Sequence, residues 1–246
     1  LPMQQGASFE LRINNVAING VGWDSTIFRG ASPLSGVVWI VYSSDNLLAN
    51  FRTENSRAGI LITGNNYNNL LFRYIKTTNH DRHFSWVEQN ASFPITIPSI
   101  ATENCYIIGG GTGFHFNEIN GATMNTKYLG MRNVTMDGPT QVGIDAPLVW
   151  DNGRVIEVRG NRDFFDSIII NTNAPFMERA YEGFRSPEGF VEFHNNSFSL
   201  QSRGIGRFNI EADPMLDSYG RPRIGSPAIG PQYMRGYAGA VPPVPP

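Results

Sequence analysis

A short pattern, in which two alternating apolar residues are followed by Asn or Gly and a further apolar residue, recurs along this chain of 246 residues. Its starting positions are separated by multiples of a unit of roughly 23–27 residues, which lies in the range of known solenoid repeats. The pattern fits residues 11–18, 60–67, 129–136, 156–164 and 191–198. Because one such unit cannot bury its own apolar side chains, the pattern predicts coils that stack and share a core.

Asparagine is frequent and stands near the ends of several of these strand patterns. It tolerates the left-handed backbone that a sharp bend requires, and its amide can bond the equivalent amide one coil away. Asn65, Asn161 and Asn196 are each followed within three residues by an aromatic residue. We expect these three asparagines to form structural corners of the coils.

The segment 213–230 reads Asp-Pro-Met-Leu-Asp-Ser-Tyr-Gly-Arg-Pro-Arg-Ile-Gly-Ser-Pro-Ala-Ile-Gly. It resembles the closing coil of right-handed parallel β-helix proteins of the pectate-lyase-like superfamily, as found in phage virion, tailspike and bacterial surface proteins. The resemblance implies a right-handed parallel β-helix. It also implies a homo-oligomer, with a trimer as one form, and virion or surface proteins as partners.

The composition favours one all-β domain. No window of a dozen residues has sustained helical periodicity, and Asn, Gly, Ser and Asp separate short alternating strand patterns. We expect a single β-solenoid domain over residues 1–239, less regular over residues 1–100, followed by a proline-rich tail over residues 240–246. The tail favours polyproline II, which cannot pair as an inner strand.

Three Asn-Gly dipeptides, at residues 19–20, 120–121 and 152–153, are hairpin signals typical of an antiparallel fold. They keep a β-sandwich or jelly roll open as the alternative fold. In that alternative, the asparagines would be ordinary turn residues in unrelated places.

Charge and cysteine content argue against several partners. Charged residues are 16% of the chain and the net charge is −2, which gives no basic footprint for nucleic acid or an anionic membrane. No apolar run approaches the length of about 18 residues that a membrane span needs. The single cysteine, Cys105, excludes an intramolecular disulfide and a Cys-based zinc cluster, and its apolar context predicts burial. We expect no nucleic-acid or membrane partner.

Known catalytic patterns are absent from the sequence. The Asn-Thr-Asp, Asp-Asp, Gly-His-Gly and Arg-Ile-Lys motifs of galacturonase-like hydrolases do not occur. Asp145 and Asp151 stand among arginines and are the candidate catalytic acids, although alternating charge on an outer strand face gives the same composition. His80 and His83 follow Thr-Thr-Asn, which predicts a solvent-facing loop rather than a metal site. We expect no metal and no cofactor.

Tryptophans supply the candidate binding residues. Trp39, within Val-Val-Trp-Ile-Val, fits a core position, whereas Trp23 and Trp150 stand beside Asp24 and Asp151 at predicted strand ends. A flat aromatic face with polar groups at its rim is suited to a sugar ring. Trp23 and Trp150 are therefore the carbohydrate-binding candidates.

These observations favour a non-catalytic structural or host-recognition protein located outside the cell or on a virion surface. A phage spike, fibre or capsid decoration protein, or a surface adhesin, fits this description, with glycans as candidate ligands. The first alternative is a polysaccharide lyase or glycoside hydrolase built on a β-helix. The second alternative is a carbohydrate-binding module.

Overall fold

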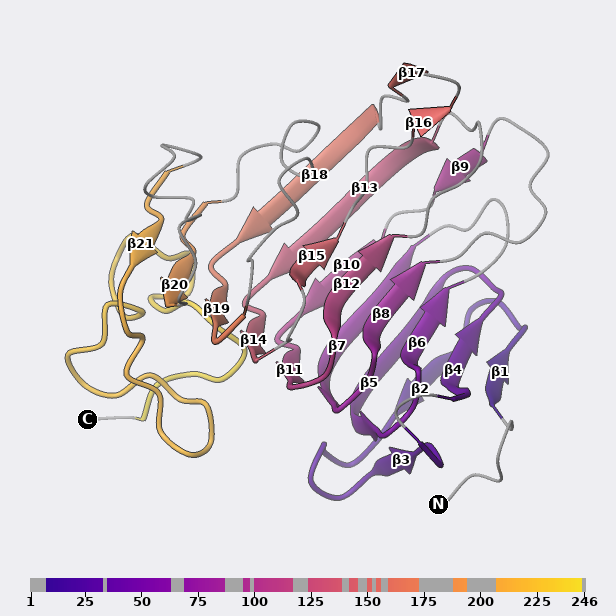
Figure 1. Cartoon of the computed structure of the whole chain (residues 1–246), viewed down its shortest axis with the longest axis horizontal. Helices are drawn as coiled ribbons and strands as arrows, with labels where there is room; N and C mark the ends of the chain where they lie inside the picture. Colours follow the sequence, from indigo (N-terminus) through magenta and orange to yellow (C-terminus); the bar gives the residue numbers. More distant parts are fainter. Residues whose placement is uncertain are drawn as a thin grey trace.

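The computed structural model describes residues 8–32, 35–62, 69–86, 95–97, 100–116, 124–138, 142–145, 150–151, 154–155, 159–172, 188–193 and 207–244. These described residues form strands and turns and contain no helix. The strands pair in parallel from coil to coil and build a right-handed parallel β-helix (Figure 1). The predicted fold class is confirmed, and the β-sandwich alternative is wrong.

One wall of the solenoid is a six-stranded parallel sheet, with one strand from each of six coils (Figure 1). Its register places Ile60 beside Trp39 in one neighbouring coil and beside Phe84 in the other. The same strand position thus carries a large apolar side chain in coil after coil. In sheet order the strands are β1 (Phe9–Leu11), β4 (Val37–Val41), β6 (Ala58–Ile62), β8 (Arg82–Trp86), β12 (Thr112–Phe116) and β15 (Val142–Asp145).

The second sheet has 13 strands and bends within each coil. Two long strands run through the bend without a break. In the coils on their outer sides, two shorter strands lie before and after the bend, and both pair with the same long strand. Thus β2 (Ala17–Asn19) and β3 (Ile27–Arg29) both pair with β5 (Asn46–Glu54), and β10 (Ile100–Glu103) and β11 (Tyr106–Ile108) both pair with β7 (Leu70–Thr78). The other strands are β9 (Ile95–Ile97), β13 (Met124–Arg132), β14 (Thr135–Asp137), β18 (Arg159–Phe165), β19 (Ile168–Ile170), β20 (Val191–Phe193) and β21 (Ile210–Glu211).

A separate antiparallel pair joins β16 (Trp150–Asp151) to β17 (Arg154–Val155). These two strands flank the Asn-Gly at residues 152–153 in the sequence. The hairpin signal is therefore correct for this short pair, although it does not extend to the fold.

The core is a column of inward side chains shared by successive coils. Phe9 stacks on Trp39 and Phe84 stacks on Phe114, each with ring centroids 5.0 Å apart. Trp39 is 6% exposed, as its apolar context predicts. Cys105 is fully buried, also as predicted, and burial raises the pKa of its thiol to about 12, so the thiol stays protonated and unreactive.

Left-handed residues form three corner columns along the solenoid. In the first column the Asn69 amide donates to the Asp45 carboxylate, and in the third the Asn79 amide donates to the Asn55 amide oxygen, both at 2.8 Å. These bonds are the ladders that asparagine corners predict. The first column contains Asn15, Asp45 and Asn69; the second contains Asn50, Tyr74, Asn104, Asn133, Asp166, Gly189 and Phe208; the third contains Asn55, Asn79, Gly109, Gly138 and Asn171.

Of the three asparagines chosen from the sequence as corners, only Asn161 lies among the described residues. Asn65 and Asn196 lie outside the described residues. Asn161 lies within β18 in register with Tyr128, and the corner of its coil is Asp166. Neighbouring coils are offset by 24 residues at Asp45–Asn69, by 30 at Arg73–Glu103 and by 33 at Asn133–Asp166, which is a wider spread than predicted.

Beyond β21 the chain forms turns rather than another strand-bearing coil, over residues 213–244, here called the C-terminal segment. It packs on the outside of the solenoid along the second corner column. The Asp166 carboxylate accepts a hydrogen bond from the Met234 N–H at 2.9 Å, and the Asn133 amide donates to the Tyr237 carbonyl at 3.0 Å. The stretch that resembles a closing coil therefore belongs to a segment that covers an outer wall of the solenoid.

Candidate functional site

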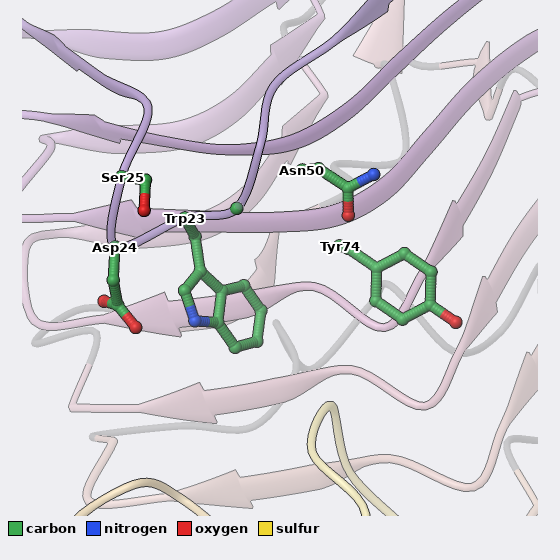
Figure 2. A pocket seen from close by; sticks show the side chains of 6 residues that line it. Trp23, Asp24, Ser25, Asn50 and Tyr74 are labelled. Carbon is green, nitrogen blue, oxygen red and sulfur yellow. The ribbon is translucent and has the colours of Figure 1, made fainter.

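A pocket of about 320 Å³ lies where the second corner column passes the first coils (Figure 2). The loop between β2 and β3 supplies four of its residues, and the corners of β5 and β7 supply the other two. In Figure 2 the Trp23 ring lies between the Asp24 carboxylate and the Tyr74 ring, and the three side chains extend toward the same side. The lining residues are Gly22, Trp23, Asp24, Ser25, Asn50 and Tyr74.

The loop is held to the neighbouring coil through its backbone. The Gly22 N–H donates to the Asn50 carbonyl at 3.0 Å, and the Thr26 N–H donates to the Gly22 carbonyl at 2.8 Å. A side chain at Gly20 would place its Cβ 2.2 Å from the Asn50 carbonyl oxygen, so this close approach requires glycine. The loop therefore presents Trp23 from a fixed backbone.

The Trp23 side chain rests on a cluster that comes from distant parts of the sequence. Its ring centroid lies 6.5 Å from that of Tyr106, with the ring planes tilted by 59°. Tyr106 is itself buried together with Ala240 and Val241 of the C-terminal segment. One face of the tryptophan is thus supported by the protein, while the pocket lies beside it.

Tyr74 is an unusual residue for its backbone position. Its φ is 53°, a left-handed conformation that costs a bulky residue about 1–3 kcal/mol. Adjacent corners of the same column, Asn50 and Asn104, carry the residue type that adopts this conformation most easily. Tyr74 is nevertheless 42% exposed, so its ring gains little from burial. An exposed aromatic ring at a strained corner beside a pocket is a feature that points to function.

Charged side chains of both signs lie close to the pocket residue Asp24 and to Tyr106. The Asp24 carboxylate, 75% exposed, lies 3.8 Å from the Arg52 guanidinium, which also pairs with Glu54 at 3.0 Å. Glu54 pairs in addition with Arg29. The Lys76 ammonium lies 5.6 Å from the centre of the Tyr106 ring. The Asp24–Arg52 pair is long and its carboxylate is exposed, so it adds little stability, but its charged groups can bond a ligand.

The lining combines aromatic ring faces with polar groups at the rim. Trp23 and Tyr74 supply apolar ring faces, while Asp24, Ser25 and Asn50 supply acceptors and donors at the rim. The Asn50 side-chain amide donates to the Asn19 side-chain oxygen at 2.6 Å, which fixes its orientation and makes its own side-chain oxygen the acceptor at the pocket. In the described part of the chain no group of three or more His, Cys, Asp or Glu side chains is arranged to hold a metal ion.

The prediction that His80 and His83 face solvent is wrong. Both are fully buried, with ring centroids 5.3 Å apart. His80 Nδ1 lies 3.1 Å from both the N–H and the carbonyl oxygen of Ser56, and Nε2 lies 3.0 Å from the Thr53 hydroxyl. His83 Nε2 lies 2.7 Å from the Gly109 carbonyl oxygen and donates to it, while Nδ1 lies 2.8 Å from the Thr77 hydroxyl.

Burial keeps this pair of histidines neutral, because a charged ring would be held away from water. Burial lowers the pKa of His80 to about 4, although bonds to Ser56 and Thr53 oppose the shift. Burial and the neighbouring His80 lower the pKa of His83 to about 3. The two histidines thus belong to the interior polar network and not to a surface site.

The other sequence candidates do not meet at the pocket. Trp150 lies in β16 in register with Val155, and Asp151 lies beside Arg154 in the same hairpin. Asp145 ends β15 in register with His115. Of the five side chains at the pocket, sequence reasoning selected only Trp23; Asp24, Ser25, Asn50 and Tyr74 were missed as binding residues. A tyrosine at a position where neighbouring coils have asparagine was the available signal, but it requires the correct coil register.

Comparisons with protein-family models, with curated proteins and with solved structures found no match to this chain. Among the described residues there is no helix with the length and apolar character needed to cross a bilayer.

Proposed function

We propose that this protein is a non-catalytic, β-helical structural and recognition protein that binds a glycan in the pocket between Trp23 and Tyr74. The observation that carries the proposal is Tyr74, an exposed ring held at a strained corner opposite a supported tryptophan. Strain of this size persists where the surrounding structure imposes it, and it clusters at ligand sites. A rigid stack of coils suits such a role because it presents the pocket on a backbone that does not rearrange.

The location and assembly follow the same proposal. The β-helix of a phage spike, fibre or capsid decoration protein, or of a surface adhesin, presents binding residues on its outer wall. We place the protein within the pectate-lyase-like superfamily, outside the cell or on a virion, as a homo-oligomer. Sedimentation of the full chain tests the assembly, because a strict monomer at micromolar concentration contradicts it.

An array of bacterial surface glycans, probed with the full chain, tests the binding role. The variant Trp23→Ala should weaken binding to any glycan retained by the native protein by about tenfold or more, the usual loss for a central aromatic contact. Phe208→Ala is the matched control, because Phe208 is 59% exposed and does not line the pocket. Equal binding by Trp23→Ala and the native chain would contradict the proposal, as would the absence of any bound glycan.

A polysaccharide lyase or hydrolase is the second candidate, and the position of Asp24 favours it. An exposed carboxylate 3.8 Å from the Arg52 guanidinium, beside two aromatic rings, combines an acid, a cation and a platform for a sugar chain. Assays for reducing ends and for unsaturated products on the bound glycans distinguish the two functions. Turnover that is lost in Asp24→Asn, Asp145→Asn or Asp151→Asn would favour the enzyme.

A further inference from the structure

The C-terminal segment lies against the second corner column over several coils. Along this column the Gly239 N–H donates to the Asp166 carbonyl at 2.8 Å, and the Ala240 N–H donates to the Thr135 hydroxyl at 2.8 Å. The Arg235 guanidinium donates to the Asn104 amide oxygen at 2.7 Å. The next two corners toward the N-terminus are Tyr74 and Asn50, which line the pocket. The docked segment and the pocket therefore occupy successive stretches of one column.

Tyr106 connects the two stretches. Its ring is 7% exposed and packs with Ala240 and Val241 on one side, while Trp23 packs against this cluster from the pocket side. A second turn of the C-terminal segment approaches the same ring at Gly220. A Cβ at Gly220 would lie 2.4 Å from Tyr106 Cε1 and 2.8 Å from its hydroxyl oxygen. The ring is thus enclosed by two parts of the C-terminal segment.

We infer that Tyr106 is a positioning residue, through which the docked C-terminal segment holds the Trp23 ring in its binding orientation. The inference rests on the proposed glycan function of the pocket. Trp23 lies on a loop whose backbone is bonded to the next coil, but its ring is supported by the Tyr106 cluster. Without that support the ring has to be ordered when the ligand binds, which weakens binding. Docking of the C-terminal segment should therefore strengthen glycan binding, and glycan binding should in turn stabilise the docked segment.

Two glycines of the C-terminal segment give a matched test. Gly220 and Gly225 both have left-handed backbones, with φ of 76° and 86°, so alanine strains both positions in the same way. Only Gly220 faces the Tyr106 ring, because a Cβ at Gly225 would meet no atom within 4 Å. The difference between Gly220→Ala and Gly225→Ala thus isolates the contact with Tyr106.

Hydroxyl-radical footprinting read by mass spectrometry measures the exposure of each tryptophan without a ligand. In Gly220→Ala we expect oxidation of Trp23 to rise by about twofold or more, while Trp39 in the core stays protected. Binding to a glycan retained on the array should weaken by about two- to tenfold, the range that corresponds to ordering one side chain. Gly225→Ala should match the native chain in both measurements.

The result that overturns the inference is a Gly220→Ala variant whose Trp23 oxidation equals that of Gly225→Ala. This readout is independent of the glycan, so a protein that binds no sugar refutes the proposed function while the footprint still decides the role of Tyr106. Should Gly220→Ala fail to fold, Val241→Ala takes its place with Val244→Ala as its control, since Val241 is 8% exposed and Val244 is 44% exposed. Trp23 oxidation that rises in Val241→Ala but not in Val244→Ala supports the inference. Equal Trp23 oxidation in these two variants overturns it.

Discussion

The outer wall of the solenoid has an open half, formed by β5 and β7, and a covered half, formed by β14, β19 and β20 (Figure 1). One outward position can be followed through both halves by strand register: Arg52, Lys76, Tyr106, Thr135, Ile168 and Val191. Along this row the side chains are first cationic, then aromatic at Tyr106, then a hydroxyl at Thr135, and finally aliphatic. Ile168 and Val191 are buried under Ala228, Tyr233 and Ala238 of the C-terminal segment. A parallel strand with apolar residues on both faces therefore marks where a second layer covers the sheet.

The interior of the two halves differs as well. The adjacent inward position carries Thr53, Thr77, Ile107, Met136 and Ile169 in successive coils. The two threonines, in the open half, bond the buried histidines, whereas the other three residues belong to the apolar core. At this inward position the open half therefore has a polar network beside its apolar core, whereas the covered half has apolar packing on both faces of the sheet. The predictions below test this difference, from the largest expected effect to the smallest.

Acidification should weaken the open half first. His80 and His83 stay neutral when folded down to pH values of about 4 and about 3, whereas in the unfolded chain they bind a proton near pH 6.5. Their contribution to stability is fully present above pH 6.5 and is lost as the pH falls toward the folded pKa values. At pH 5 the loss is about 2 kcal/mol for each ring. Hydrogen exchange should therefore accelerate more in β5, β7 and β8 than in β14, β19 and β20.

The variant His80→Gln provides the control for this prediction. It removes one of the two titrating rings, so the loss of stability between pH 7 and pH 5 in urea unfolding should fall by about half. This comparison uses the change with pH, and it does not depend on how stable the variant is at pH 7. An unchanged pH dependence would show that other groups control acid unfolding and would break the proposed contrast between the halves.

Shortening a side chain of the outward row to alanine should lower the free energy of unfolding only in the covered half. Ile168 is fully buried between the sheet and the C-terminal segment, so Ile168→Ala should lower the free energy of unfolding by about 3 kcal/mol. Lys76→Ala, in the same row of the open half, should change it by no more than about 0.5 kcal/mol. Urea unfolding measures both variants. Similar losses of unfolding free energy in the two variants would show that covering by the C-terminal segment makes no energetic difference between the two halves.

The fold could be read from the sequence because its main signals are local. Alternating apolar residues with asparagine between them predict short strands and left-handed corners, and the structure contains both. The register could not be read in the same way. Residues 11–18 include the first corner column at Asn15, whereas residues 129–136 include the second at Asn133. Every strand alternates and asparagine occurs at all three columns, so an overlay of strand patterns does not identify which corner is which.

The site was less accessible to prediction than the fold. Trp23 could be selected because it stands beside Asp24 after a strand pattern. Tyr106 and Val241 support it from positions remote in the sequence, and such contacts follow only from the path of the C-terminal segment. The histidines were misjudged for a related reason. Their hydrogen-bond partners, Thr53, Thr77 and Gly109, belong to three different strands or corners that only stacking brings together.

The smallest predicted effect concerns Tyr74 and separates stability from binding. Tyr74→Asn places the preferred left-handed residue at this corner and should raise the free energy of unfolding by about 1 kcal/mol. It also removes one ring from the pocket, so glycan binding should weaken.

Phe208→Asn is the matched control, because Phe208 is an exposed aromatic residue with a φ of 59° in the same column but outside the pocket. It should gain similar stability in urea unfolding and leave glycan binding unchanged. If Tyr74→Asn binds the glycan as tightly as the native chain does, the Tyr74 ring is not needed for binding. The strain at this corner would then have no role in ligand recognition.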